Sequence, residues 1–352
     1  MDLESREVVE NRASQTQKHE VQFTGDTRSY FSIWIVNILF TIATLGIYSA
    51  WATVRNKQYF FGHTLINGHR FDYLATPLQI LKGRLLAIAC FALYVVSSTY
   101  FSVIALLLIV VWCIALPWII NQGLRFNLRM TRYRNVQFSF KGRYKDAFVN
   151  FVLLPVLSIF TLYLLLPWVL KRIDSYIHNN IHYGDKKLNT QLSTREYYSI
   201  AFACFCMSIG IGIVVAILAM VTGASFSESP QIITGIVLLM QLSLVMIVTS
   251  AYQAMVRNHV YNNSHIEGVA EFESGLEPVD YVILNVTNVL AIVFTLGLAF
   301  PWAKVRKAKM LAAATVVHLH PEAEQVVNVQ QANQSSFAEE AANVFDVDIS
   351  LT

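Results

Sequence analysis

The feature that most constrains the fold is a series of long apolar runs that carry almost no charge. They cover residues 29–51, 85–118, 147–170, 197–222, 231–256 and 280–303. A run of about 20 apolar residues is long enough to cross the hydrocarbon layer of a membrane as a helix. The second run is too long for one crossing and breaks at residues 97–100, so it predicts two helices. Only 14% of the chain is charged, against about a quarter in soluble domains. We predict an all-α fold, a polytopic transmembrane bundle of about seven helices.

A twelve-residue phrase near the start of the chain returns near its end. It reads TLGIYSAWATVR at residues 44–55 and TLGLAFPWAKVR at 295–306, and a weaker copy lies at 161–172. The connectors between the runs are short, aromatic and strand-like, and they also resemble one another. The chain is therefore expected to consist of internal repeats. The expected parts are a polar N-terminal tail (1–20), two units of three helices each (21–140 and 138–275), a truncated third unit with one helix (269–310) and a polar, acidic C-terminal tail (311–352).

Each copy of the phrase ends in a Trp that is followed four residues later by an Arg. Trp prefers the membrane interface, and Arg just beyond it prefers the headgroup phosphates. The i, i+4 spacing places both side chains on one face of a helix. Two further apolar runs end in a similar way. The predicted interfacial anchors are Trp51, Arg55, Trp118, Trp168, Arg172, Arg257, Trp302 and Arg306.

A polar stripe runs along the first and last apolar runs. Asn37 and Thr44 are seven residues apart, and so are Asn288 and Thr295. Seven residues are nearly two helical turns, so each pair lies on one face of a continuous helix. An Asn in hydrocarbon needs a polar partner, so both should face other helices. The stripe indicates either hydrogen bonds between helices or a substrate path formed by these four residues.

The topology has two interpretations. Units of three helices would be inverted relative to one another in the membrane, as in many secondary transporters. The distribution of Lys and Arg then places the C-terminus in the cytoplasm. Alternatively, the helices that carry the phrase are re-entrant, all long connectors are cytoplasmic, and all 26 Lys and Arg residues of the chain lie inside. The heptad spacing of the stripe favours straight helices, so seven crossings are predicted.

Two stretches carry a family resemblance. They read RSYFSIWIVNILFTIATLGIYSAWATVRNKQYFFGHTLINGHRFDY at residues 28–73 and GLRFNLRMTRYRNVQFSF at 123–140. Both resemble signature stretches of the YjgN family of bacterial inner-membrane proteins, over about residues 20–310. Ser49 and Ala50 depart from the family, which tends to have Pro before the Trp. The resemblance implies a multi-pass helical protein of the bacterial cytoplasmic membrane, and it implies no reaction.

The sequence offers little that points to catalysis. It contains no nucleophile–base motif and no Asp or Glu deep in an apolar run, so neither a catalytic residue nor a cofactor is expected. His178 and His182 could share a helix face as metal ligands, but the sequence places no third ligand near them, so no metal site is predicted.

The expected partners follow from charge and aromatic content. The basic, aromatic connector at 123–145 suits anionic lipid headgroups rather than nucleic acid. The acidic tail is a candidate for binding a protein partner. We therefore expect a transporter or permeation protein for a small solute or lipid. The alternative is a membrane scaffold or lipid-interacting protein without transport.

Overall fold

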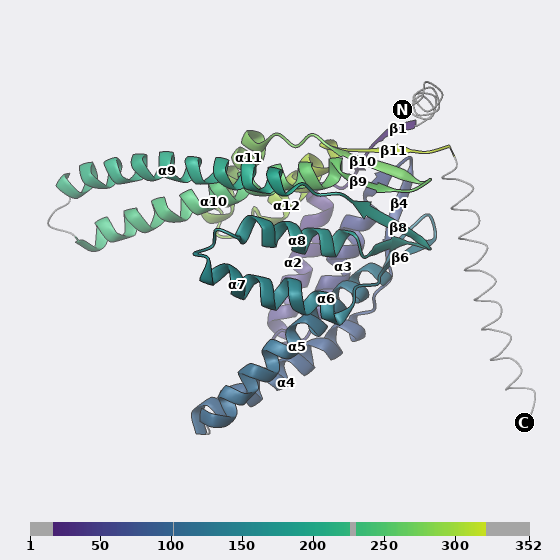
Figure 1. Ribbon diagram of the computed structural model, residues 1–352, viewed down its shortest axis with the longest axis horizontal. Helices are drawn as coiled ribbons and strands as arrows, with labels where there is room; N and C mark the ends of the chain where they lie inside the picture. The colour runs from purple at the N-terminus through teal and green to yellow at the C-terminus, as the bar shows by residue number, and fades with distance from the viewer. Residues whose placement is uncertain (1–16, 101, 226–229, 322–352) are drawn as a thin grey trace, which may run out of the picture.

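The computed structural model describes residues 17–100, 102–225 and 230–321, in which helical hairpins alternate with β-hairpins (Figure 1). The helices are α2 (Thr27–Ala43), α3 (Ser49–Gly62), α4 (Pro77–Tyr100), α5 (Ser102–Arg129), α6 (Tyr144–Phe148), α7 (Leu154–Phe160), α8 (Leu166–His178), α9 (Thr194–Ser225), α10 (Pro230–Asn262), α11 (Pro278–Phe294) and α12 (Phe300–Ala313). A π-helical turn, η1 (Val149–Leu153), joins α6 to α7 next to Pro155, which lacks an N–H donor.

The strands form one antiparallel sheet that nearly closes on itself. They are β1 (Gln17–Glu20), β2 (Gln22–Phe23), β3 (Thr64–Ile66), β4 (His69–Tyr73), β5 (Thr131–Tyr133), β6 (Val136–Phe140), β7 (Ile181–Tyr183), β8 (Lys186–Thr190), β9 (Ser264–Ile266), β10 (Ala270–Ser274) and β11 (Thr315–Leu319). Their order is β1-β11-β10-β9-β8-β7-β6-β5-β4-β3-β2. Because β1 and β2 belong to one extended segment, pairing of β1 with β11 and of β2 with β3 joins the two ends of the sheet. We call this nearly closed barrel the strand ring.

The prediction of an all-α bundle is therefore wrong. The aromatic connectors, expected as short links between helices, pair with one another across long sequence distances. The turns Asn67–Gly68 and Arg134–Asn135 have positive φ at both residues, as tight two-residue hairpins require. A single short hairpin is marginally stable in water, so pairing around the ring stabilises each one. The predicted tails also contribute, since β1 lies within 1–20 and β11 within 311–352.

The prediction of seven crossings is also wrong. Among the described residues, four helices are long and apolar enough to cross a membrane: Pro77–Tyr100, Val103–Arg129, Thr194–Leu218 and Thr234–Asn262. They form two long hairpins, α4–α5 and α9–α10. The runs that carry the repeated phrase each fold into a short hairpin instead, namely α2–α3, α6–α8 and α11–α12. Residues 21–140, expected to hold three helices, thus contain α2, α3, α4 and α5.

The repeated phrase folds into the turn of each short hairpin. Thr44 ends α2 and bridges the two helices, because its hydroxyl donates to the Phe40 carbonyl (2.7 Å) and accepts from the Tyr48 amide (2.9 Å). Leu45 and Gly46 then reverse the chain with φ of 50° and 92°. Left-handed residues cannot continue an α-helix, so the heptad stripe does not lie on one straight helix.

The other two copies repeat this geometry. Thr295 donates to the Ala291 carbonyl and accepts from the Ala299 amide at 2.7 and 2.9 Å. In the middle copy the Leu165 amide donates to the Thr161 hydroxyl at 3.4 Å. The residue after each Thr again has positive φ. The Thr-Leu pair is therefore a hairpin-turn motif.

The tips of the short hairpins are apolar and unpacked. Leu45, Leu162 and Leu296 are 96%, 85% and 95% exposed. The 17 residues of α2 span about 25 Å, less than the roughly 30 Å of the hydrocarbon layer. Exposed Leu at a helix turn is costly in water and favourable in lipid. The length of the short hairpins therefore predicts that they enter the membrane without crossing it.

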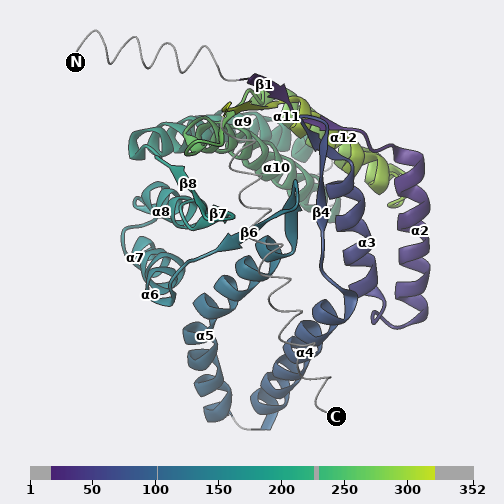
Figure 2. The ribbon, with the colours of Figure 1, turned by 90° about the vertical axis from the view of Figure 1, so that its right-hand side faces the viewer.

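The helical hairpins surround the ring and leave it on one side, opposite the β-turns. Figure 1 shows α9 and α10 extending away from the strands, and Figure 2 shows α2–α3, α4–α5 and α6–α8 arranged around them. The first and last hairpins are neighbours, because Trp34 of α2 stacks on Phe300 of α12 with ring centroids 6.1 Å apart. Tyr30 packs against Val305 in the same contact. The helices therefore follow the circular order of the strands.

The turn conformation predicts that replacing Gly46 lowers the stability of the protein. Gly46→Ala places a Cβ in open space at φ of +92°, so its cost is conformational and amounts to about 1 kcal/mol. The expected result is a lower midpoint of thermal unfolding in detergent micelles. Gly62→Ala, also in open space but at the end of α3, is the matched control and should not lower it. Equal midpoints for both variants would contradict the assigned turn.

The hairpin lengths predict accessibility. In a background with the native cysteines replaced by Ala, Ser98→Cys near the far end of α4 should react in intact cells with a membrane-impermeant thiol reagent applied outside. Leu162→Cys, at the exposed tip of a short hairpin, should stay unlabelled, because a hairpin of this length would end inside the hydrocarbon layer. Labelling of Leu162→Cys from outside would show that this hairpin crosses.

Candidate functional site

The interior of the strand ring is apolar. Residues alternate between the two faces of a strand, and the central residue of each second hairpin strand points inward. These residues are Phe71, Phe138, Leu188 and Phe272, from β4, β6, β8 and β10. The buried cluster around them consists of Val21, Val136, Tyr183, Leu188, Ile266, Val269, Ala270, Ala312 and Val317. The ring thus encloses side chains rather than a polar channel.

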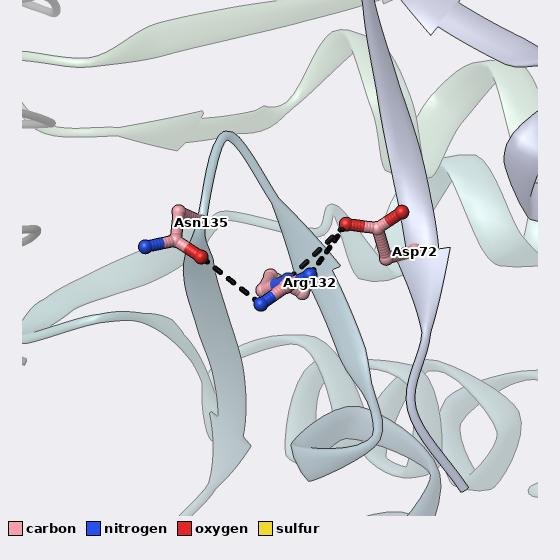
Figure 3. A network of polar contacts seen from close by, with 3 residues as sticks. All are labelled: Asp72, Arg132 and Asn135. Atoms are coloured by element: carbon pink, nitrogen blue, oxygen red, sulfur yellow. Dashed lines mark hydrogen bonds and ion pairs between the residues drawn. The ribbon is translucent and has the colours of Figure 1, made fainter. Parts of the chain in front are cut away.

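The outer face of the ring is polar, as Figure 3 shows for β4 and β5. Arg132 donates from Nε and Nη2 to Oδ2 of Asp72, at 3.1 and 2.9 Å, and from Nη1 to Asn135 at 3.0 Å. Asp72 directly follows the inward-facing Phe71 in the sequence, so the two faces alternate as in any half-buried strand. Both charged groups are partly exposed, so the pair contributes at most about 1 kcal/mol.

A cavity of about 360 Å³ lies at the helix end of the ring; we call it the helix-side cavity. Its wall includes residues at or near the ends of four helices, namely Phe61 (α3), Leu128 (α5), His178 (α8) and Val260 with Tyr261 (α10). The strands contribute Phe71, Thr131, Phe138, Ile181, Leu188, Ser264, Ile266 and Phe272. Among these described lining residues none is Lys, Arg, Asp or Glu, so the cavity suits an apolar ligand.

A second cavity of about 120 Å³ lies nearer the β-turns; we call it the turn-side cavity. It shares Phe71, Phe138, Phe272 and Ile266 with the helix-side cavity. Its other lining residues are Ile66, Tyr133, Arg134, Tyr183, Val269, Ala270, Val317 and Leu319. The three shared phenylalanines, which we call the aromatic layer, therefore separate the two spaces.

Both tyrosine hydroxyls of the turn-side cavity donate hydrogen bonds to the backbone. The Tyr133 hydroxyl donates to the Ile66 carbonyl at 2.8 Å, and the Tyr183 hydroxyl donates to the Tyr133 carbonyl at 3.1 Å. Burial raises the pKa of Tyr133 to about 12, and it raises the pKa of Tyr183 as well. Both phenols are therefore neutral at physiological pH and act as structural donors.

The residues of the predicted path do not line either cavity. Asn37 donates to the Asn56 side chain at 3.2 Å, and Asn288 donates to the Ala303 carbonyl at 3.3 Å. Each bond ties the two helices of one short hairpin. Thr44 and Thr295 lie in the turns of the same hairpins. These contacts fit the packing interpretation of the stripe, and the path stays a prediction.

The predicted anchors divide into two groups. Arg172 lies over Trp168 and Arg306 over Trp302, with the guanidinium carbon 5.9 and 5.2 Å from the ring centre. Trp118 is exposed near the end of the second apolar run. These positions are compatible with interfacial anchoring.

The other arginines make different contacts. Arg55 lies over Tyr48 rather than Trp51, at 5.8 Å. Arg257 donates to the Thr315 hydroxyl at 2.6 Å and so fastens α10 to the start of β11. The bond between Arg257 and Thr315 is therefore a structural contact of the strand ring.

The histidines considered as ligands lie on different elements. His178 ends α8, and its Nδ1 lies 2.8 Å from the Asp174 carbonyl oxygen, whereas His182 is in β7. Within the described parts of the chain, no group of three or more His, Cys, Asp or Glu residues is arranged to hold a metal ion. Most of the acidic tail, from residue 322 on, lies outside the described residues.

Comparison with known proteins places the chain in a family. The model of the family described as "Bacterial protein of unknown function (DUF898)" matches residues 18–344. The inner membrane protein YjgN of Salmonella typhimurium is 32% identical over 157 residues, which is 42% of this chain and 38% of the relative.

The protein of that name from Escherichia coli strain K12 is 32% identical over 140 residues, or 40% of this chain and 35% of the relative. The matched segments thus span well under half the length of these curated relatives. No solved structure matches the chain. The family match covers most of the sequence, and the chain therefore belongs to the DUF898 family, whose relatives named YjgN are inner membrane proteins.

Proposed function

We propose that this membrane protein binds the hydrocarbon chain of a membrane lipid inside the strand ring. The observation that carries the proposal is the helix-side cavity, which is apolar and measures about 360 Å³. Ligand pockets typically occupy about 300–1,000 Å³. Each methylene moved from water into such a site contributes about 0.8 kcal/mol. A chain of several methylenes would therefore be held tightly without any charged contact.

The position of the cavity supports a lipid as its occupant. Its wall includes the ends of α5 and α10, which belong to the long membrane hairpins, and of α3 and α8, which belong to the short ones. The same helices continue from the cavity into the hydrocarbon layer. Hydrocarbon is therefore the solvent nearest to the helix end of the ring.

The charge distribution supports a ring on the cytoplasmic side. Neither 85–124 nor 196–256, which contain the far ends of the long hairpins, includes a Lys or Arg, so all 26 lie elsewhere. Lys and Arg are enriched on the cytoplasmic side of membrane proteins. The re-entrant interpretation agrees with this distribution, and it places both ends of the described chain in the cytoplasm.

The apolar lining of the ring argues against the transport of a polar solute, although the sequence led us to expect a transporter for a small solute or lipid. A path for a polar solute needs polar groups along it, whereas the aromatic layer and the surrounding cluster are apolar. Lipid binding, the alternative expected from the sequence, fits this interior better. Movement of a bound lipid is the form of transport that the same cavity would permit. We propose no catalytic activity.

Filling the cavity tests the proposal. The full-length protein, purified in detergent, should bind a fluorescent polyene fatty acid saturably. Leu188→Trp should weaken this binding at least tenfold, because the larger side chain excludes about two methylenes from the cavity. The readout is the fluorescence titration of the probe.

Leu65→Trp is the matched control. Leu65 lines the outer surface of the ring beside Lys18 and His19, so the same substitution there should leave binding unchanged. Circular dichroism and size-exclusion chromatography establish that both variants fold. Absence of saturable binding to the wild type, or an equal loss in both variants, would refute the proposal.

A further inference from the structure

We infer that the aromatic layer of Phe71, Phe138 and Phe272 limits how long a chain the ring accepts, so that the ligand is a linear acyl chain of bounded length. The inference rests on the proposed lipid binding and adds the element that selects the ligand. It follows from the way in which the two cavities meet.

The layer lies between two spaces of unequal size. The helix-side cavity is three times as large as the turn-side cavity, and the two share the three phenylalanines and Ile266. A chain that enters from the helix end meets this layer before it reaches the smaller space. The layer is therefore the floor of the larger cavity.

Two of the phenylalanines are supported from the turn side. Phe71 packs on Tyr133 with ring centroids 4.7 Å apart, and Phe138 packs on Tyr183 at 5.1 Å. Phe71 and Phe138 themselves are nearly parallel, with centroids 6.5 Å apart. A phenylalanine on this side can move toward the turns only if a tyrosine moves with it.

The supporting tyrosines are fixed in turn by hydrogen bonds. Their hydroxyls donate to backbone carbonyls of the ring, as described above, at 2.8 Å for Tyr133 and 3.1 Å for Tyr183. Displacing either ring would leave a buried donor and a buried acceptor without partners, which is costly. The floor of the cavity is therefore rigid on the side of β4, β5, β6 and β7.

The space beyond the layer is small and mainly apolar. It measures about 120 Å³, and most of its lining residues are apolar. The rigid layer keeps a terminal methyl of the ligand out of this space. Each methylene added to a ligand should therefore increase affinity only until the chain touches the layer.

A series of saturated fatty acids of increasing length tests this limit by displacement of the fluorescent probe. In the wild type, affinity should rise about fourfold per methylene and then reach a plateau. Phe138→Ala opens the layer toward the turn-side cavity, so its plateau should move to longer chains. Phe138→Trp should move the plateau to shorter chains.

Two further variants keep the outcome unambiguous. Phe138→Leu preserves more of the packing than Ala and should move the plateau in the same direction by a smaller amount. Phe160→Ala, at the exposed tip of α7, removes the same atoms outside the ring and should leave the plateau in place.

The outcomes separate this inference from the proposed function. If the wild type binds fatty acids with a plateau that none of the Phe138 substitutions moves, the aromatic layer does not set the limit, although lipid binding stands. If the wild type binds no fatty acid of any length, the proposed function itself fails. Displacement of the plateau in opposite directions by Ala and Trp supports the inference.

Discussion

The structure depends on the main-chain pairing of residues 17–23 with two strands at once. The first half of this segment pairs with β11 and the second half with β3, while the Val21 amide between them donates to the Thr315 carbonyl at 3.0 Å. Without these bonds the sheet would have two open edges, which are sites of aggregation. Each helical hairpin is attached to the ring at both of its ends. The segment therefore fixes the position of the helices as well as the strands.

The sequence predicts the membrane character of this fold better than its connectivity. The runs at 85–118, 197–222 and 231–256 became the long hairpins, because length and lack of charge are sufficient to identify such helices. The sequence predicts straight helices in place of the short hairpins, because the turns are as apolar as the helices that they join. Only the left-handed conformation at Leu45 and its equivalents reveals the reversal. Pairing among strands of two to five residues depends on the nearly closed ring and leaves little local signal.

The candidate site cannot be predicted from the sequence for a related reason. The recurrence of Phe at the centre of HRFDY, VQFSF and AEFES is visible in the sequence, and its alternation with polar residues predicts strands with one buried face. The sequence does not tell which face of each strand is buried or what it packs against. Both depend on how the β-hairpins assemble into the strand ring. The sequence points to the buried Asn residues instead, because an amide in hydrocarbon needs a polar partner. Their partners proved to lie within their own hairpins.

The pairing of β1 with β11 gives the ring a seam. Gln17 is paired with Leu319 in the same antiparallel manner that joins the two strands of each β-hairpin. A short peptide linking these two residues would turn the seam into one more hairpin, and the chain could then be cut at another turn, such as Asn67–Gly68, without altering any strand pair. The strand pairs thus form a circular series, and the order of the parts along the chain is one of several circular permutations that would keep these pairs.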